Sequence, residues 1–202
     1  MKRPIDIAFT DSVRRAQSRY GAREHGQRLE DSGRWQAELT PDLKAFIEAR
    51  DSFYLATASA DGRPYIQHRG GLPGFLKVLD DKTLGFADYP GNRQYITAGN
   101  LDENDRAFIF LMDYARRRRV KLWGRAAVID DAPELLAKLH LAAMPKAPER
   151  AIRFRIETWD VNCQQYIVRR YTEDDIAKVV APLEARIEAL EAELAKARGR
   201  QG

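Results

Sequence analysis

The segment from His68 to Tyr95 combines cationic side chains with glycines and a helix start. Its basic residues include His68, Arg69, Lys77 and Arg93. A phosphate dianion needs cations for charge and free backbone N–H groups for geometry. Glycine lets the backbone approach a ligand closely, and a helix start leaves N–H groups unpaired. The segment therefore predicts a site for a phosphate-bearing cofactor.

Each of these features also has an ordinary structural explanation. Gly70 and Gly71 suit any loop between strands. Lys77 lies in a β-like stretch in which its neighbours, Leu76 and Val78, point to the opposite face. Such a lysine either reaches solvent or meets an anion in a cleft. Because a basic pair and glycines precede it, we favour the anion.

Gly91-Asn92-Arg93 precedes a predicted helix that begins at Gln94. Arg93 would then lie in the first helical turn, where the helix dipole disfavours a cation unless an anion is also present. This local conflict supports the phosphate site. The alternative is a surface arginine at a helix start.

Arg116–Arg119 is the densest basic run. It is either the charged tip of a hairpin or a phosphate-binding patch for nucleic acid. Aromatic residues do not alternate with it as in a stacking platform, and basic residues elsewhere are spread among acidic ones. We therefore prefer a hairpin in which only Arg119 faces the cofactor, and nucleic acid is disfavoured as a partner.

The amides of Asn162, Gln164 and Gln165 follow the end of a predicted strand. Amides supply both donors and acceptors, so they could bind the edge of a heterocycle. Cys163 is interpreted as a small packing residue rather than a nucleophile, because the sequence places no partner histidine beside it. The three histidines show no metal-binding spacing, and we expect no metal site.

Composition places the chain among folded proteins outside the membrane. Hydrophobic residues make up 44% of the 202 residues, and the formal net charge is +4. No apolar run approaches the roughly 20 residues of a membrane span. The first residues are charged and lack the apolar core of a signal peptide. With one cysteine, these features predict a cytoplasmic protein.

Short β-rich runs dominate the middle of the chain. Strands are predicted within residues 53–57, 64–68, 75–79, 83–87, 107–112, 120–129 and 153–159. Helices are expected within 13–23, 41–50, 94–100 and 131–140. At least seven strands with turns between them and few helices predict an antiparallel barrel rather than a doubly wound parallel sheet.

The C-terminal residues predict an amphipathic helix after Pro182. Leu183, Ile187, Leu190 and Leu194 recur at alternating spacings of four and three, and Ala197 continues the pattern. Two heptads are marginal alone, so the helix either docks on its own domain or associates with another copy.

The chain resembles the pyridoxamine 5'-phosphate oxidase-like superfamily of FMN-binding split barrels, and more narrowly a bacterial subgroup of flavin-nucleotide-binding proteins. The resemblance is strongest from Asp51 through Pro64–Gly71 to Trp123-Gly124-Arg125, and the run Gly91–Ile96 and the pair Asn162-Cys163 are typical of the subgroup. It implies a mainly β fold, a six-stranded antiparallel split barrel with flanking helices. The corresponding domains are an N-terminal arm (1–40), the FMN-binding barrel (41–170) and a C-terminal helix (171–202).

The resemblance further implies a homodimer with FMN at the interface, each flavin touched by both chains. Lys77 matches the family's phosphate-binding lysine, Asn92-Arg93 its basic pair, and Phe86–Asp88 the strand along the flavin ring. The expected cofactor-binding residues are His68, Arg69, Gly70, Phe75, Leu76, Lys77, Phe86, Asp88, Asn92, Arg93, Gln94, Arg119, Asn162 and Gln165.

We therefore expect an FMN-dependent oxidoreductase of unknown substrate, with hydride transfer to FMN. No catalytic acid or base is assigned, because hydride transfer to flavin need not have one. The alternative is a non-catalytic carrier of flavin or haem on the same barrel. The two differ in whether a nicotinamide donor reduces the bound group.

Overall fold

The computed structural model describes residues 3–144, 146–162 and 164–199. By contacts the chain divides into two units. The first comprises Met1–Asp113 and Arg118–Gln164, and the second comprises Tyr114–Arg117 and Gln165–Gly202. No helix within the described residues is long and apolar enough to cross a membrane.

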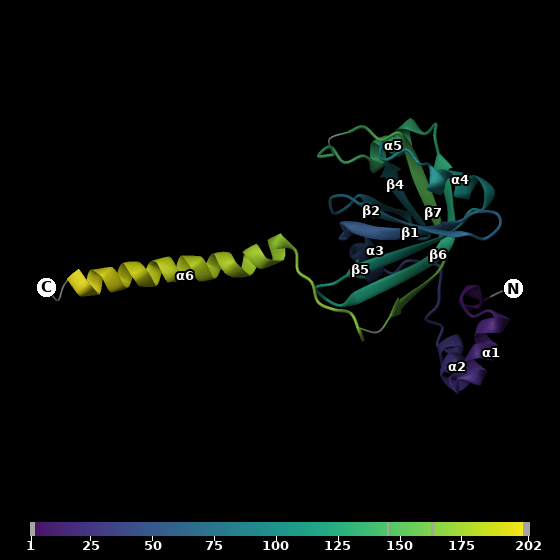
Figure 1. Ribbon diagram of the computed structural model, residues 1–202, viewed down its shortest axis with the longest axis horizontal. Coiled ribbons are helices and arrows are strands. Elements are labelled where there is room, and N and C mark those ends of the chain that lie inside the picture. Colours follow the sequence, from purple (N-terminus) through teal and green to yellow (C-terminus); the bar gives the residue numbers. More distant parts are fainter. Residues whose placement is uncertain (1–2, 145, 163, 200–202) are drawn as a thin grey trace. The chain divides into compact units, whose positions relative to one another are not determined.

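One antiparallel sheet forms the body of the first unit (Figure 1). Its strands are β1 (Ser52–Ala58), β2 (Pro64–Gly70), β3 (Leu76–Asp80), β4 (Thr83–Asp88), β5 (Arg106–Asp113), β6 (Arg118–Ile129) and β7 (Arg150–Asn162). The spatial order is β2-β1-β5-β6-β7-β4-β3, so β2 and β3 are the edges. The sheet has seven strands, which confirms the number counted from the sequence and corrects the six implied by the resemblance.

The sheet curls around an apolar interior. Phe53 of β1 stacks on Phe75 with ring centroids 5.5 Å apart, and its ring meets Phe86 of β4 edge-on at 5.1 Å. These contacts join strands from the two halves of the spatial order. The core continues through fully buried aliphatic side chains such as Leu55, Ile109 and Leu122. The architecture is a split barrel, as predicted. A twisted sheet that curls on itself buries one of its faces and so removes the apolar side chains of that face from water.

Helices flank this sheet. Their bounds are η1 (Pro4–Ile7), α1 (Asp11–Arg19), α2 (Arg23–Asp31), α3 (Pro41–Glu48), α4 (Ile96–Glu103) and α5 (Pro133–Leu139). Thr40 caps α3 through its hydroxyl oxygen, which accepts a hydrogen bond from the backbone N–H of Leu43 at 3.3 Å. Pro41 occupies the first helical turn, as the Thr-Pro pair predicts.

The N-terminal segment packs on the sheet through aromatic side chains. Trp35 lies 5.6 Å from the ring of Phe9 and 5.4 Å from that of Trp123 on β6. The indole N–H of Trp159 donates to the backbone carbonyl of Glu38 at 3.0 Å. Sequence reasoning expected one short helix here, whereas α1 and α2 both form. Gly26 is tolerated inside α2, where it is buried against Gln17.

The second unit contains the longest helix, α6 (Glu173–Gly199). It begins nine residues before Pro182, which lies inside the helix rather than at its start. Thr172 precedes the helix, and its hydroxyl oxygen accepts from the N–H of Asp175 at 3.1 Å. This N-cap explains the earlier start, and proline is tolerated at a cost of one backbone hydrogen bond.

Candidate functional site

The two halves of the split barrel meet at an ion pair between Arg69 on β2 and Asp88 at the end of β4. Arg69 pairs in register with Phe53, and directly paired residues share a face of the sheet. Its guanidinium therefore extends toward the barrel interior and lies 5.8 Å from the ring of Phe86. The Nε of Arg69 is buried and has no hydrogen-bond acceptor among the described residues.

Alternating charges extend from Asp88 to the surface. The Nε of Arg150 lies 3.7 Å from Asp88 Oδ2, and another of its nitrogens lies 2.9 Å from Glu149. Arg93 approaches Glu149 at 4.0 Å. Burial disfavours the charged form of Arg150, but hydrogen bonds with Glu149 and Tyr95 outweigh it and raise the pKa of its guanidinium. Arg150 is therefore a fixed cation beside Asp88.

The loop before α4 has two residues in the left-handed conformation, Arg93 (φ 56°) and Tyr95 (φ 54°). The side-chain oxygen of Asn92 accepts from the backbone N–H of Gln94 at 3.3 Å, which stabilises the turn. Because of this turn, α4 begins at Ile96 and not at Gln94 as predicted. No side chain of the described residues caps the helix, so its first N–H groups remain available.

These parts surround a cavity of about 260 Å³. Its walls come from the end of β2, the segment 88–98 with the start of α4, and the region around Glu149 and Ile152. A second cavity of about 220 Å³ lies between β2, the loop that begins at Gly71, and β4. The two share Gln67, Arg69 and Tyr89. Arg69 thus lies where both cavities meet.

This arrangement suits an anion with an extended organic part. Arg69 offers an unused N–H, and the uncapped start of α4 adds backbone N–H groups and the positive end of its dipole. Tyr65, Tyr89 and Tyr95 add aromatic surface to the larger cavity. Charge at one end and aromatic walls along the side are what a phosphorylated heterocycle requires.

Most of the predicted site residues gather at these cavities. Arg69, Asp88, Asn92, Arg93 and Gln94 line the larger one. His68, Arg69, Gly70, Phe75 and Phe86 line the smaller one. They come from three separate parts of the chain, brought together by the curl of the sheet.

Other predicted residues lie elsewhere. Leu76 is fully buried in the core, and Lys77 is half-buried on β3 and lines neither cavity. Arg119 pairs through the backbone with Asn162 on β7, also outside the two cavities. The side chain of Asn162 and all of Cys163 lie outside the described residues. Gln165 belongs to the second unit.

Sequence reasoning missed several residues of the larger cavity. Glu149 lines this cavity, and its neighbour Arg150 contacts the lining residue Asp88. Both lie at the start of β7, about 60 residues beyond Asp88, and only the folded sheet reveals the pairing. Thr97 donates its hydroxyl to Gln67 at 2.9 Å and ties α4 to β2. The charged Glu149-Arg150 pair, a few residues before the strand predicted at 153–159, was the available signal, but such pairs are common.

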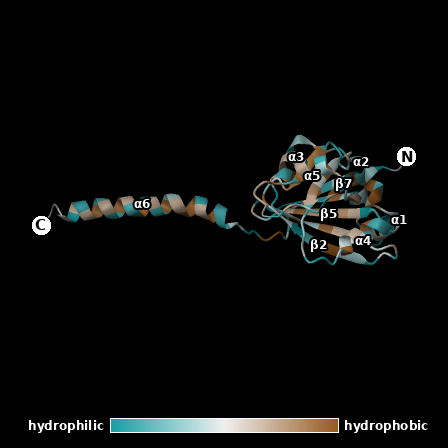
Figure 2. Ribbon diagram, turned by 90° about the horizontal axis from the view of Figure 1, so that it is seen from above, coloured by the Kyte–Doolittle hydropathy of each residue, from teal (hydrophilic) through white to brown (hydrophobic). Residues whose placement is uncertain are grey.

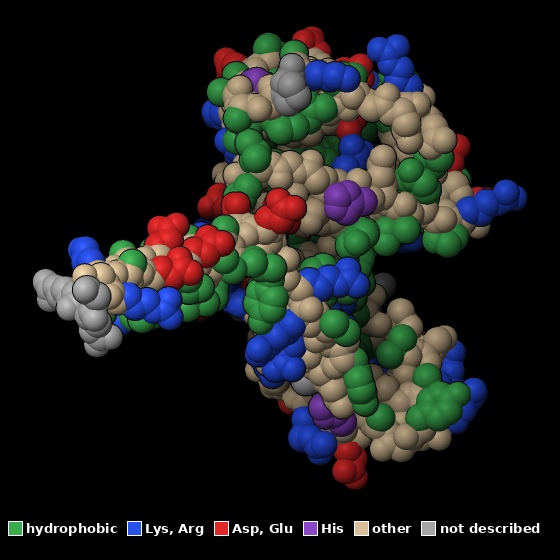
Figure 3. Space-filling view, turned by 60° about the vertical axis from the view of Figure 1, so that its left-hand side comes forward, with side chains coloured by type: hydrophobic (Ala, Val, Ile, Leu, Met, Phe, Trp, Pro, Cys, Tyr) green, Lys and Arg blue, Asp and Glu red, His purple; other side chains and the backbone are tan. Residues whose placement is uncertain are grey.

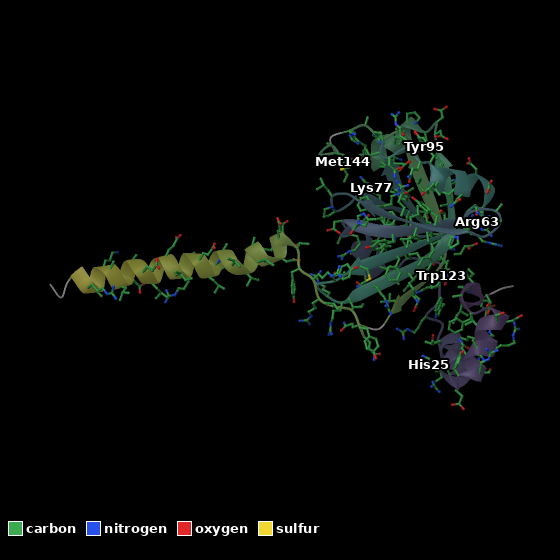
Figure 4. The ribbon with its side chains drawn as sticks, viewed as in Figure 1. His25, Arg63, Lys77, Tyr95, Trp123 and Met144 are labelled. Carbon is green, nitrogen blue, oxygen red and sulfur yellow. The ribbon has the colours of Figure 1, made fainter. Side chains whose placement is uncertain are left out.

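A further cavity of about 500 Å³ lies between the N-terminal segment and β6–β7, lined by Phe9, His25, Trp35 and Trp123 among others. In Figure 4, Trp123 and His25 lie far from Tyr95 and Met144, which mark the cavities described above. Two charged residues of this lining, Lys121 and Asp160, form an ion pair with each other at 3.0 Å. None of its lining atoms is a buried polar atom without a partner among the described residues. It is therefore the weaker candidate for an anionic ligand.

Comparisons with known proteins agree with this architecture. HupZ from Group A Streptococcus is 18% identical with a TM-score of 0.51, over 66% of this chain and 99% of that protein. An FMN-binding protein from Syntrophomonas wolfei is 13% identical (TM-score 0.44; 71% and 96% covered). HutZ, the haem storage protein from Vibrio cholerae, is 19% identical (TM-score 0.44; 61% and 94% covered). At 18% identity the likeness to HupZ is one of fold alone. A search of curated proteins gave no match.

The sequence profile of the pyridoxamine 5'-phosphate oxidase family matches residues 39–163. This range runs from just before α3 to the end of β7, so it contains every strand and both cavities with Arg69. The helices α1, α2 and α6 lie outside this range. On this match, over more than half of its length, the chain belongs to the pyridoxamine 5'-phosphate oxidase family.

Proposed function

We propose that this protein binds FMN and acts as an FMN-dependent oxidoreductase. The observation that carries the proposal is the buried Nε of Arg69, which has no acceptor among the described residues. It lies at the junction of two cavities, next to the uncapped start of α4. A buried donor without an acceptor is costly unless a ligand completes it, and a phosphate oxygen would do so.

The chain's own residues have separate roles in this proposal. Arg69 and the N–H groups of α4 hold the phosphate. Asp88 keeps the guanidinium of Arg69 in place, and Arg150, whose Nε lies 3.7 Å from Asp88 Oδ2, holds the carboxylate of Asp88 from the other side. The tyrosines of the larger cavity border the organic part of the ligand. Bound FMN would supply the redox chemistry, accepting a hydride from a donor and passing electrons to an acceptor.

The size of the cavities supports a site shared between two chains. At about 260 and 220 Å³, each is below the roughly 300–1,000 Å³ of a typical small-molecule site. We propose that a second copy completes the site in a homodimer. Arg119 would then face the flavin ring bound by the partner chain, where a cation stabilises the reduced anion.

The first test is FMN binding by the purified protein. We expect bound or added FMN to be retained, and Arg69→Gln to weaken binding at least ~10-fold, because it removes a charge-assisted contact to phosphate. Arg63→Gln is the matched control. Arg63 lies on the same β1–β2 hairpin, and its side chain is 85% exposed and forms an ion pair with Asp61 alone among the residues that the structure describes. Riboflavin, which lacks the phosphate, should bind both variants equally.

A protein that fails to bind FMN would overturn the proposal, and so would equal FMN affinities for the two variants. Lys77→Ala, compared in the same titration, tests whether the phosphate site extends to β3. Release and identification of any co-purified pigment distinguishes flavin from haem. A haem spectrum would instead support the carrier function.

Oxidoreductase activity requires a separate measurement. We expect NADH or NADPH to reduce the bound FMN under anaerobic conditions, with bleaching of the flavin absorbance. A carrier would retain FMN and leave it oxidised with either donor. We also propose the reducing cytoplasm as the compartment, because the chain has one cysteine.

A further inference from the structure

The helix α6 carries a continuous apolar seam that is longer than the sequence pattern indicated. Because the helix begins at Glu173, the alternating spacing of four and three starts at Ile176 rather than at Leu183. Its members are Ile176, Val180, Leu183, Ile187, Leu190 and Leu194, each between 38% and 59% exposed. Figure 2 shows the alternation of apolar and polar residues along α6, and Figure 3 shows hydrophobic side chains exposed beside charged ones.

The spacing of this seam is that of a coiled coil. An average of 3.5 residues keeps a stripe facing a partner helix along its whole length, whereas packing on a globular surface follows 3.6. In heptad notation, Val180, Ile187 and Leu194 occupy a positions. Ile176, Leu183 and Leu190 occupy d positions. β-branched residues at a with leucine at d favour two parallel strands. Two of the three a positions (Val180 and Ile187) and two of the three d positions (Leu183 and Leu190) follow this rule, so most of the seam favours a parallel pair.

The charges beside the seam fit a second copy of the same helix. In a parallel pair, each g position faces the e position five residues further along the partner. Arg186 at g would face Glu191, and Glu193 at g would face Arg198. Both contacts join opposite charges, and symmetry makes each occur twice. An antiparallel pair brings e positions together and g positions together, so Glu184 would oppose Glu191 while Arg186 would meet Glu193. It therefore has one repulsive contact where the parallel pair has two attractive ones.

We propose that α6 pairs with α6 of a second copy of this chain as a parallel two-stranded coiled coil. This interface is distinct from the one proposed at the flavin site and does not depend on FMN. Pro182 falls at a c position, on the outside of the pair, so it does not interrupt the seam. Three heptads are short for an isolated helix, and burial of six apolar side chains from each copy provides the missing stability.

Disulfide trapping in the full chain tests the pairing. In a Cys163→Ser background, Leu183→Cys places a thiol at a d position, where an in-register parallel pair brings the same residue of both copies face to face. Ala185→Cys, two residues away at an f position, is the control. We expect mild oxidation to link Leu183→Cys into a dimer at least ~10-fold faster than Ala185→Cys.

Charge reversal provides the second measurement. Arg186→Glu places a carboxylate of each copy opposite Glu191 of the other, so that like charges meet twice. It should slow linkage of Leu183→Cys about threefold. The double change of Arg186→Glu with Glu191→Arg should restore it, because the pairs are again opposite. Equal linkage at positions 183 and 185 would overturn the proposal. Absence of linkage at position 183 would also overturn the proposal. This is the result expected if the protein is monomeric, if α6 pairs in antiparallel orientation, or if the apolar seam packs on the barrel of its own chain.

Discussion

At the scale of single residues, the barrel is joined by contacts that only one residue type can make. Arg69 extends from an edge strand across the interior, and its planar group can bind Asp88 while one N–H remains directed elsewhere. Lysine would offer a single point charge and could not do both. If Arg69 both joins the barrel and binds a ligand, its burial and the missing hydrogen bond of its Nε–H are both explained.

Gly71 is a second such residue, because a Cβ there would lie 2.7 Å from the ring of Phe75. Phe75 is held by its stacking on Phe53, so it has little freedom to move. We expect Gly71→Ala to lower the free energy of unfolding by about 1–3 kcal/mol, the usual cost of overpacking. Urea unfolding measures this change.

Gly99→Ala is the control for Gly71→Ala. Gly99 lies in α4, and a Cβ there meets no atom within 4 Å. Alanine in a helix is favoured over glycine by up to ~1 kcal/mol, so this variant should be as stable as the parent or more so. If Gly71→Ala were as stable as Gly99→Ala, the ring of Phe75 would have room to move and would not be fixed by its stacking on Phe53.

At the scale of elements, the N-terminal helices are held by ion pairs that converge on one buried carboxylate. Arg3, Arg14 and Arg23 all bind Glu30, whose side chain is 3% exposed. Burial raises the pKa of Glu30, but hydrogen bonds from Arg14, Arg3 and Arg23 outweigh it and lower the value to about 2. A hydrogen bond from Arg14 and another from the backbone of Arg3 likewise lower the pKa of Asp6 to about 2.

This cluster predicts loss of the N-terminal helices in acid. A carboxyl whose pKa is lower in the folded chain stabilises the fold above its ordinary pKa, and that contribution disappears as the pH falls through the folded value. The window here runs from the ordinary values of 4.5 and 3.8 down to about 2. Fluorescence of Trp35, which packs on Phe9 and Trp123, should change within this window.

Glu30→Gln should release the same helices at neutral pH, detected as faster proteolysis within residues 1–31. Glu24→Gln is matched to it, because Glu24 is exposed on the same helix α2. Equal protection of the two variants would show that aromatic packing alone holds the segment.

Elements were predicted well where local chemistry determines them. All seven strands and α3 follow from alternation, turns and the Thr40-Pro41 cap. The start of α4 was wrong because it depends on left-handed backbone at Arg93 and Tyr95. Glu149 and Arg150 were beyond prediction for a similar reason. They meet Asp88, which was predicted, only because β4 pairs with β7, and no local pattern encodes that register.

At the scale of the whole molecule, the proposed flavin site has two parts on different chains. Arg69 lies at the cavities, whereas Arg119 lies outside them beside β7. In a homodimer, a variant lacking either residue would damage both sites. A mixed dimer of one Arg69→Gln chain and one Arg119→Ala chain would contain one intact site and one doubly damaged site.

Mixing the two variants by unfolding and refolding them together tests this arrangement. Each variant alone should retain little FMN, and the random mixture should recover about a quarter of the parent protein's content, because half of the dimers are mixed and each has one intact site. If both residues served the same chain's site, every site in the mixture would remain damaged and no FMN would return. The coiled coil proposed for α6 does not alter this count, since it joins two chains without regard to which variant they carry. Recovery would therefore report on the division of the site between chains, and its absence would place Arg119 and Arg69 in one site or remove Arg119 from it.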